Sequence, residues 1–398
     1  MKRILPVIVI SQFFCTSLWF AGNAIINDIV RIYNLPVDYV AHLASAVQFG
    51  FISGTLVFAL LSIADRFSPS KVFFFSALIA ALFNLAIIMN GINAPVILSF
   101  RFLTGFFLAG IYPVGMKIAA DYYQQGLGKS LGWLLGALVL GTAFPHLLKT
   151  VTTGLSAGEA GLPWKYVVYA TSFLAVLGGM AMLLLVPDGP HRKPGQKPSL
   201  LAFLKGFNNP HFRSAALGYF GHMWELYAFW VFVPVILAYY KLHNSEAGFT
   251  VSLVTFLIIA SGSIACVLGG MISLKQGPKR VATTALFISC ICCLLSPLVF
   301  STHTTPLLFV FLFIWGMTIV ADSPMFSTLI AHNAPPASKG ASLTIVNSIG
   351  FAITIVSIQL INALINAENT RYIFTILAIG PVLGLIALVS DRGVRKPV

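Results

Sequence analysis

Four ionisable side chains lie inside long apolar stretches of this sequence: Arg101, Lys117, Glu225 and Asp322. An ionised group in hydrocarbon costs roughly 2.5 to 3.5 kcal/mol on insertion scales, so each one needs a partner, a water-filled cavity or a function. Two of these residues are cationic and two are anionic. They could therefore neutralise one another, or they could bind a solute and protons.

Glu225 has the strongest case for proton chemistry. It follows His222 by three residues, and this spacing places both side chains on one face of a helix. A carboxyl group in nonpolar surroundings can bind and release a proton near neutral pH. We therefore predict a proton-coupling pair. The alternative is a structural hydrogen-bonded pair between helices.

Asp322 precedes Ser323 and Pro324, and this motif predicts a second polar site. Proline cannot donate to the helix ladder and so frees a backbone carbonyl, which the nearby carboxylate and hydroxyl complement. We predict substrate or proton binding here, against a structural bridge to a neighbouring helix. Tyr112 and Pro113 mark the equivalent break earlier in the chain, and Tyr112 is a further candidate.

The two cations differ in their predicted roles. The planar guanidinium of Arg101 suits a carboxylate or phosphate, which favours an organic anion or zwitterion as substrate. Pairing of Arg101 with an acid of the protein is an equal alternative. Lys117 lies near the end of its apolar stretch, where a long side chain can extend to the membrane surface.

Neutral polar residues complete the candidate site. Trp19 and Asn23 flank Gly22 in the first apolar stretch, and Gln48 lies in the second. Polar groups beside aromatic rings suit a solute pocket at the interface of two transporter halves. Asn23 and Gln48 could equally form hydrogen bonds between helices.

The elements that must position these residues follow from composition. Of the 398 residues, 58% are hydrophobic and only 9% are charged, which excludes an ordinary soluble domain. A helix needs about 20 mostly apolar residues to span a bilayer. Twelve such stretches occur, and we predict an all-α polytopic membrane protein. They are Ile4–Asn27, Tyr39–Ile63, Lys71–Ile92, Val96–Ala119, Lys129–Lys149, Lys165–Val186, Arg213–Ala238, Phe249–Leu274, Arg280–Phe300, Pro306–Ala331, Ala341–Ile365 and Arg371–Val389.

A basic segment rich in Pro and Gly, residues 188–212, separates the sixth and seventh stretches. It predicts two six-helix bundles, 1–187 and 213–398, joined by a cytoplasmic linker. The net charge of +13 comes mainly from Lys and Arg in connections on one side of the membrane. This bias predicts that both termini are cytoplasmic and that the protein lies in the cytoplasmic, or inner, membrane.

The two halves also share short sequence patterns, which indicates an internal duplication. After the second and eighth stretches, proline, a basic residue and valine recur at one offset. A glycine and a proline recur in the fourth and tenth stretches at a similar offset. The matched pairs are Pro69 with Pro278, Lys71 with Arg280, Val72 with Val281, Gly105 with Gly316 and Pro113 with Pro324.

Together with these features, the loop after the second stretch resembles a signature of the major facilitator superfamily, Gly-x-x-x-Asp-Arg-x-Gly-Arg-Arg. Asp65, Arg66 and Lys71 match its charged positions, whereas Leu61 and Ser68 replace its glycines. The resemblance implies two parallel six-helix bundles and a gating role for this loop. Arg101 followed by Gly105 matches a second family signature in the fourth helix.

These observations predict a secondary active transporter, a proton-coupled symporter that moves a small polar solute by alternating access. The fifth stretch lacks the adjacent Gly-Pro signature of the drug-exporting branches of the family, which disfavours a drug exporter. A multidrug or metabolite efflux antiporter is therefore kept only as the alternative. A membrane enzyme is a weaker alternative, because no catalytic motif is present. We expect no cofactor, no metal site and no nucleic-acid partner. The expected partners are the solute, protons and the bilayer, and the expected state is a monomer.

Overall fold

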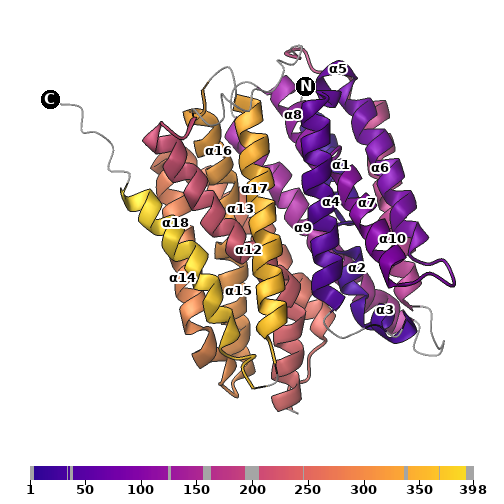
Figure 1. The fold of residues 1–398 in the computed structure, drawn as a ribbon, viewed down its shortest axis with the longest axis vertical. Coiled ribbons are helices and arrows are strands. Elements are labelled where there is room, and N and C mark those ends of the chain that lie inside the picture. The colour runs from indigo at the N-terminus through magenta and orange to yellow at the C-terminus, as the bar shows by residue number, and fades with distance from the viewer. Residues whose placement is uncertain are drawn as a thin grey trace. The chain divides into compact units, whose positions relative to one another are not determined.

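The computed structural model describes residues 4–33, 35, 39–123, 127–155, 163–192, 206–244, 246–335, 339–366 and 368–390. Helices make up its regular structure throughout these ranges (Figure 1). The helices are α1 (Ile4–Thr16), α2 (Ala21–Ala24), α3 (Ile26–Tyr33), α4 (Tyr39–Leu60), α5 (Ile63–Arg66), α6 (Pro69–Ala86), α7 (Ala94–Leu108), α8 (Tyr112–Tyr122), α9 (Leu127–Leu155), α10 (Pro163–Leu185), α12 (Pro210–His243), α13 (Val251–Gln276), α14 (Pro278–Phe300), α15 (Thr305–Ala321), α16 (Ser323–Asn333), α17 (Lys339–Leu364), the 3₁₀ helix η2 (Ile373–Ala378) and α18 (Ile379–Ser390).

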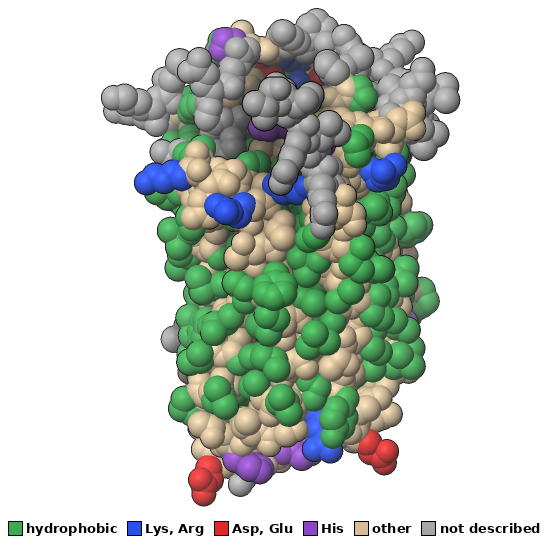
Figure 2. All heavy atoms as spheres, turned by 90° about the vertical axis from the view of Figure 1, so that its left-hand side faces the viewer, with side chains coloured by type: hydrophobic (Ala, Val, Ile, Leu, Met, Phe, Trp, Pro, Cys, Tyr) green, Lys and Arg blue, Asp and Glu red, His purple; other side chains and the backbone are tan. Residues whose placement is uncertain are grey.

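The prediction of an all-α membrane protein is confirmed. Eleven helical stretches in the described ranges are long and apolar enough to cross a membrane, and α1 is a shorter apolar helix. Many large hydrophobic side chains are exposed, among them Leu184 and Leu298, which are 69% and 67% exposed. Figure 2 shows such side chains covering the middle of one face, with Lys and Arg gathered toward one end. A lipid-facing surface explains this exposure.

The first predicted span is not one continuous helix. The helix α1 ends at Thr16, and α2 begins only at Ala21. The side chains of Thr16 and Ser17 both bond backward to backbone carbonyls, at Gln12 and Phe14. Such bonds compete with the regular helix ladder. The carbonyl groups that the break releases are bound by a buried arginine, which is described below.

Two other breaks occur where the sequence predicts them. The fourth span divides into α7 and α8 just before Pro113, and the tenth divides into α15 and α16 just before Pro324. In each case proline occupies the first turn of the new helix, where its missing N–H costs little. Asp322 is the residue at the second break.

The chain divides into two compact units, which are described separately. Unit 1 comprises Met1–Gly195 and Trp230–Ser263, and unit 2 comprises Gln196–Phe229 and Ile264–Val398. Within unit 1, α4 packs on α7, α6 on α10, and α1 on α9 and α10. Within unit 2, α14 packs on α15, α16, α18 and η2. Our bundle boundaries at 187 and 213 stay a prediction, and residues 193–205 of the linker lie outside the described ranges.

Glycines allow the backbones of α4 and α7 to pack directly against each other. A Cβ atom added at Gly50 would lie 1.9 Å from the carbonyl oxygen of Phe102, and one added at Gly105 would lie 2.1 Å from that of Val47. Only a residue without a Cβ fits these positions, as in other small-residue helix contacts in membranes. Arg101 therefore extends from a helix that is held firmly against α4.

Candidate functional site

A buried carboxylate with three hydrogen-bond donors lies in unit 2. Glu225 of α12 is fully buried, and its Oε1 atom accepts from the indole Nε1–H of Trp315 at 2.6 Å. Ser289 and Cys293 lie one turn apart on α14 and donate to the same carboxyl group at 3.0 and 3.2 Å. Donors on two other helices therefore hold the Glu225 side chain in one position.

A second buried pair lies one helical turn away. Nδ1 of His222 on α12 lies 2.8 Å from Oδ1 of Asp322 at the α15–α16 break, and both side chains are almost fully buried. The approach is angled away from a linear hydrogen bond, and Nε2 of His222 has no hydrogen-bond partner in the described part of the chain. The ring packs against Tyr219 and Phe326.

These residues form what we call the acidic cluster: Glu225, His222 and Asp322. Glu225 and Asp322 are close enough for their charges to interact. Within the described ranges, neither carboxyl group pairs with a Lys or Arg. The cluster therefore joins two acids and an imidazole, which are side chains that bind and release protons in proteins.

Arg101 binds backbone carbonyl groups in unit 1. Its side chain is fully buried in α7, and Nη2 donates to the carbonyl oxygens of Leu18 and Trp19 at 3.1 and 2.6 Å. Nη1 donates to Oδ1 of Asn84 at 3.2 Å. The guanidinium therefore satisfies carbonyls that the break after α1 releases, where a cation is also favoured by the helix dipole.

Two nitrogens of Arg101 are thus occupied by the protein itself. Its Nε atom has no hydrogen-bond partner among the described residues, and it lies beside Gly22. Asn84 extends the contact to α10, where its amide donates to Ser172 and Thr171. The preference for an anionic solute stays a prediction, because these observed partners are not acidic.

The neutral candidates also lie in unit 1. The ring of Trp19 packs 4.8 Å from that of Phe51, one turn after Gln48 on α4. Gln48 and Asn23 are buried, and neither side-chain amide has a hydrogen-bond partner within the described ranges. Tyr112 is buried at the start of α8. An unsatisfied buried amide is costly, so Gln48 and Asn23 call for a ligand or water.

The predicted gating loop is tied to α8 and to the segment that follows α10, both in unit 1. Nζ of Lys117 lies 3.0 Å from Asp65 and 3.6 Å from Asp121, so Lys117 forms ion pairs and does not merely extend to the membrane surface. Arg192 donates to the carbonyl oxygens of Asp65 and Phe67 at 3.1 and 2.8 Å. Arg66 and Lys71, in contrast, are exposed.

We expect Asp65→Asn to slow transport with little effect on stability. The Asp65–Lys117 pair is partly exposed, so its loss should cost only about 0 to 1 kcal/mol of unfolding free energy. A gating contact acts during the transport cycle, so flux should fall several-fold. The matched control is Asp28→Asn, which breaks the Asp28–Lys149 pair elsewhere in unit 1. Equal flux in both variants would remove Asp65 from the gating role.

The sequence pattern predicts Glu225 and His222 as site residues but does not indicate the three hydrogen-bond donors around Glu225. The signal that could have found Ser289 and Cys293 is their spacing of four residues, which places both side chains on one face of a helix. Asn84 carried no sequence signal beyond being polar in an apolar stretch.

Comparison with known proteins identifies the family. The sequence matches the Major Facilitator Superfamily over residues 8–358 and, in a second match, over residues 215–397. This chain belongs to that superfamily, whose members are transporters. A comparison with curated proteins gives no match.

Solved structures of low sequence identity share the fold. They include the proton:xylose symporter XylE bound to 6-bromo-6-deoxy-D-glucose, with a TM-score of 0.73 at 12% identity, covering 96% of this chain and 94% of that one. The human organic anion transporter MFSD10 gives 0.72 at 14%, with 97% and 99% covered. A bacterial homologue of the human lysosomal transporter Spinster gives 0.67 at 15%, with 99% of both chains covered. The predicted twelve-helix transporter fold is confirmed.

Proposed function

We propose that this protein is a proton-coupled symporter for a small polar solute, an organic anion or zwitterion, and that it works by alternating access. The observation that carries the proposal is the acidic cluster of unit 2. Two buried carboxyl groups and an imidazole lie together there, and no Lys or Arg of the described ranges pairs with either acid. The xylose symporter with the same fold supports this class of coupling.

The surroundings of Glu225 suit both of its protonation states. When the carboxyl group is ionised, it accepts from Trp315, Ser289 and Cys293. When it is protonated, its O–H can donate to Oγ of Ser289, because the hydroxyl hydrogen can turn instead to the carbonyl of Leu286 at 3.1 Å. A proton can therefore enter or leave with only a hydroxyl rotation.

His222 and Asp322 offer a second place for a proton. Nδ1 of His222 and Oδ1 of Asp322 lie 2.8 Å apart, and His222 lies one turn from Glu225 on the same helix. An imidazole can accept a proton at one nitrogen and release one at the other. In our proposal this pair delivers protons to Glu225 or removes them from it.

The buried amides of unit 1 are our proposed solute contacts. Gln48 and Asn23 each offer donors and an acceptor, which suit hydroxyl, carboxylate or amino groups of a solute. Trp19 supplies an aromatic surface beside them. A side-chain amide that hydrogen-bonds to the solute is expected to lack a hydrogen-bond partner within the protein.

We expect Gln48→Leu to weaken solute binding without destabilising the fold. The amide has no protein partner to lose, and removing it also removes a buried unsatisfied group, so the melting temperature should stay the same or rise. Loss of one hydrogen bond to solute should raise KM roughly tenfold. Concentration-dependent uptake and thermal unfolding of the same preparation measure both effects. A fall in melting temperature with unchanged KM would assign Gln48 to helix packing.

The solute must first be found. A thermal-shift screen of the purified protein against amino acids, carboxylates, other organic anions and sugars, followed by uptake of any hit into proteoliposomes, tests the proposal. We expect accumulation when the outside is more acidic than the lumen. Accumulation driven by the reverse gradient would indicate an antiporter, and turnover without flux would indicate an enzyme. Stabilisation by no anion or zwitterion would contradict the proposed solute class.

A further inference from the structure

The short helix α2 of unit 1 lies among buried polar atoms that have no hydrogen-bond partner in the described part of the chain. They are the side-chain amides of Asn23 and Gln48, Nε of Arg101 and Nε2 of His146. These four residues are at most 4% exposed. They belong to α2, α4, α7 and α9, and α2 packs on both α4 and α9. A buried polar group without a partner is costly, so these atoms together indicate a ligand.

Two contacts of α9 place His146 level with α2. A Cβ atom added at Gly141 would lie 2.1 Å from Oγ1 of Thr16, which precedes α2. Nζ of Lys149 lies 2.6 Å from Oδ2 of Asp28, which follows α2. His146 lies between these two contacts on the same helix, and its spacing of three residues from Lys149 puts both on one face. His146 therefore lies at the height of α2 along α9.

The positive charge of Arg101 lacks a counter-charge among the described residues. Arg101 forms no ion pair there, and its hydrogen bonds go to two carbonyl oxygens and the amide oxygen of Asn84. A buried cation is stable when an anion accompanies it. Gly22 leaves room on the Nε side of the guanidinium, because a Cβ there would lie 3.1 Å from Nε. An anion bound beside Gly22 would supply the missing charge.

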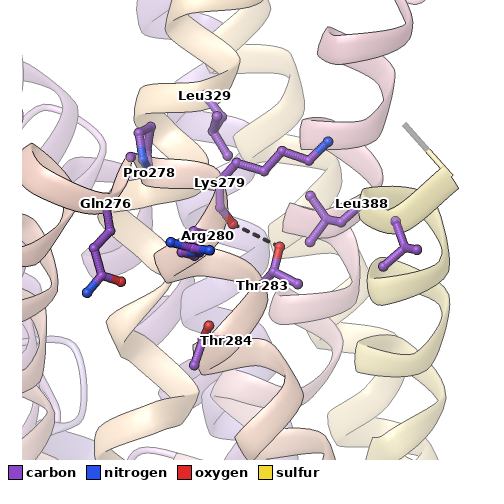
Figure 3. A pocket seen from close by; sticks show the side chains of 10 residues that line it. Gln276, Pro278, Lys279, Arg280, Thr283, Thr284, Leu329 and Leu388 are labelled. Atoms are coloured by element: carbon purple, nitrogen blue, oxygen red, sulfur yellow. Dashed lines mark hydrogen bonds between the residues drawn. The ribbon is translucent and has the colours of Figure 1, made fainter. Parts of the chain in front are cut away.

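Solvent access distinguishes these atoms from the polar groups of a pocket in unit 2. That pocket is lined by Lys279, Arg280 and Thr283, among others, and it is open to the surface (Figure 3). Water can satisfy polar groups in such a place. The polar atoms around α2 are shielded from the surface, so a bound molecule must satisfy them.

We propose that His146 is a further solute-binding residue, and that its Nε2–H and the Nε–H of Arg101 donate to a carboxylate group of the transported solute. An imidazole carries a hydrogen on Nε2 in one of its two neutral tautomers. One buried cation matches the single charge of a carboxylate better than the nearly double charge of a phosphate group. The inference rests on the proposed function and narrows its solute class to carboxylates, with the amides of Asn23 and Gln48 contacting the rest of the solute.

Binding of small carboxylates to the purified protein tests the proposal. The probes are lactate, succinate, benzoate and alanine, each compared with the carboxamide of the same skeleton. We expect at least one carboxylate, and not its carboxamide, to raise the melting temperature of the wild type. Titration calorimetry of that carboxylate then gives its Kd. His146→Leu should raise this Kd roughly tenfold to a hundredfold, since a hydrogen bond to a charged group is lost. His146→Gln keeps a donor near the position of Nε2 and should retain most of the affinity.

The matched control is His332→Leu, the same substitution at an exposed histidine of α16, and it should leave the Kd unchanged. Gly22→Ala crowds Nε of Arg101 and should also raise the Kd, so it decides the matter if His146→Leu does not fold. Binding of no carboxylate, equal binding of the carboxamide, or an unchanged Kd in these site variants would overturn the proposal. Binding is measured without a proton gradient, so a failure of proton coupling would leave this result intact. Proton-coupled uptake of an uncharged solute would contradict the carboxylate site alone.

Discussion

Glu225→Gln should abolish solute accumulation driven by a proton gradient while preserving solute counterflow. Glutamine is nearly isosteric with glutamate and keeps an oxygen that accepts from Trp315 and an NH₂ group that can donate to Ser289. The fold and solute site should therefore survive. Only the exchangeable proton is lost. Counterflow needs no net proton movement, so it separates loss of coupling from loss of transport.

The matched control is Glu246→Gln, the same substitution at an exposed acid, which should leave both activities unchanged. Accumulation in proteoliposomes under an imposed pH gradient and counterflow without one are measured on the same preparations. Full gradient-driven accumulation by Glu225→Gln would contradict our assignment of Glu225. Loss of both activities, with an unchanged melting temperature, would instead place Glu225 at a step that all transport requires.

Gly105→Ala should lower stability by more than about 3 kcal/mol, at the upper end of the effect of overpacking. The added Cβ would lie 2.1 Å from the backbone oxygen of Val47, and a backbone atom cannot rotate away as a side chain can. The helices α4 and α7 would have to separate along their shared face, and Arg101 would move with α7. Thermal unfolding in detergent measures the loss.

Gly154→Ala is the control for this prediction, because a Cβ there meets nothing within 4 Å. Alanine favours a helix over glycine by up to about 1 kcal/mol, so this variant should be unchanged or slightly more stable. A Gly105→Ala protein with the melting temperature of the wild type would show that α4 and α7 are not in direct backbone contact at Gly105.

The fold could largely be predicted from the sequence, because each membrane helix is marked by its own run of apolar residues. The breaks before Pro113 and Pro324 were also predictable, because proline disrupts the helix at its own position in the sequence. The break after Thr16 was not, because no proline marks it. The carbonyl groups of Leu18 and Trp19 at this break accept from Arg101, which lies 83 and 82 residues further along the chain, and only the packed helices bring that guanidinium there.

The candidate site was predictable only in part. The spacing of His222 and Glu225 indicated one helical face, but their partners lie on other helices, and helical periodicity says nothing about those neighbours. The contact of Asp322 with His222 and the donation from Trp315 to Glu225 arise from tertiary packing. For Arg101, the guanidinium chemistry predicts an anionic solute, and this stays a prediction, while its partners in the described part of the chain are carbonyl oxygens and an amide.

Solute-induced proton movement tests the central claim most directly. Wild-type protein is reconstituted into proteoliposomes that hold a pH-sensitive dye, without an imposed gradient, and the solute identified by the stability screen is added outside. Our account predicts that the lumen becomes more acidic as solute enters, and that Glu225→Gln abolishes this signal. Solute entry with no change in luminal pH, or with a rise in pH, would contradict proton symport.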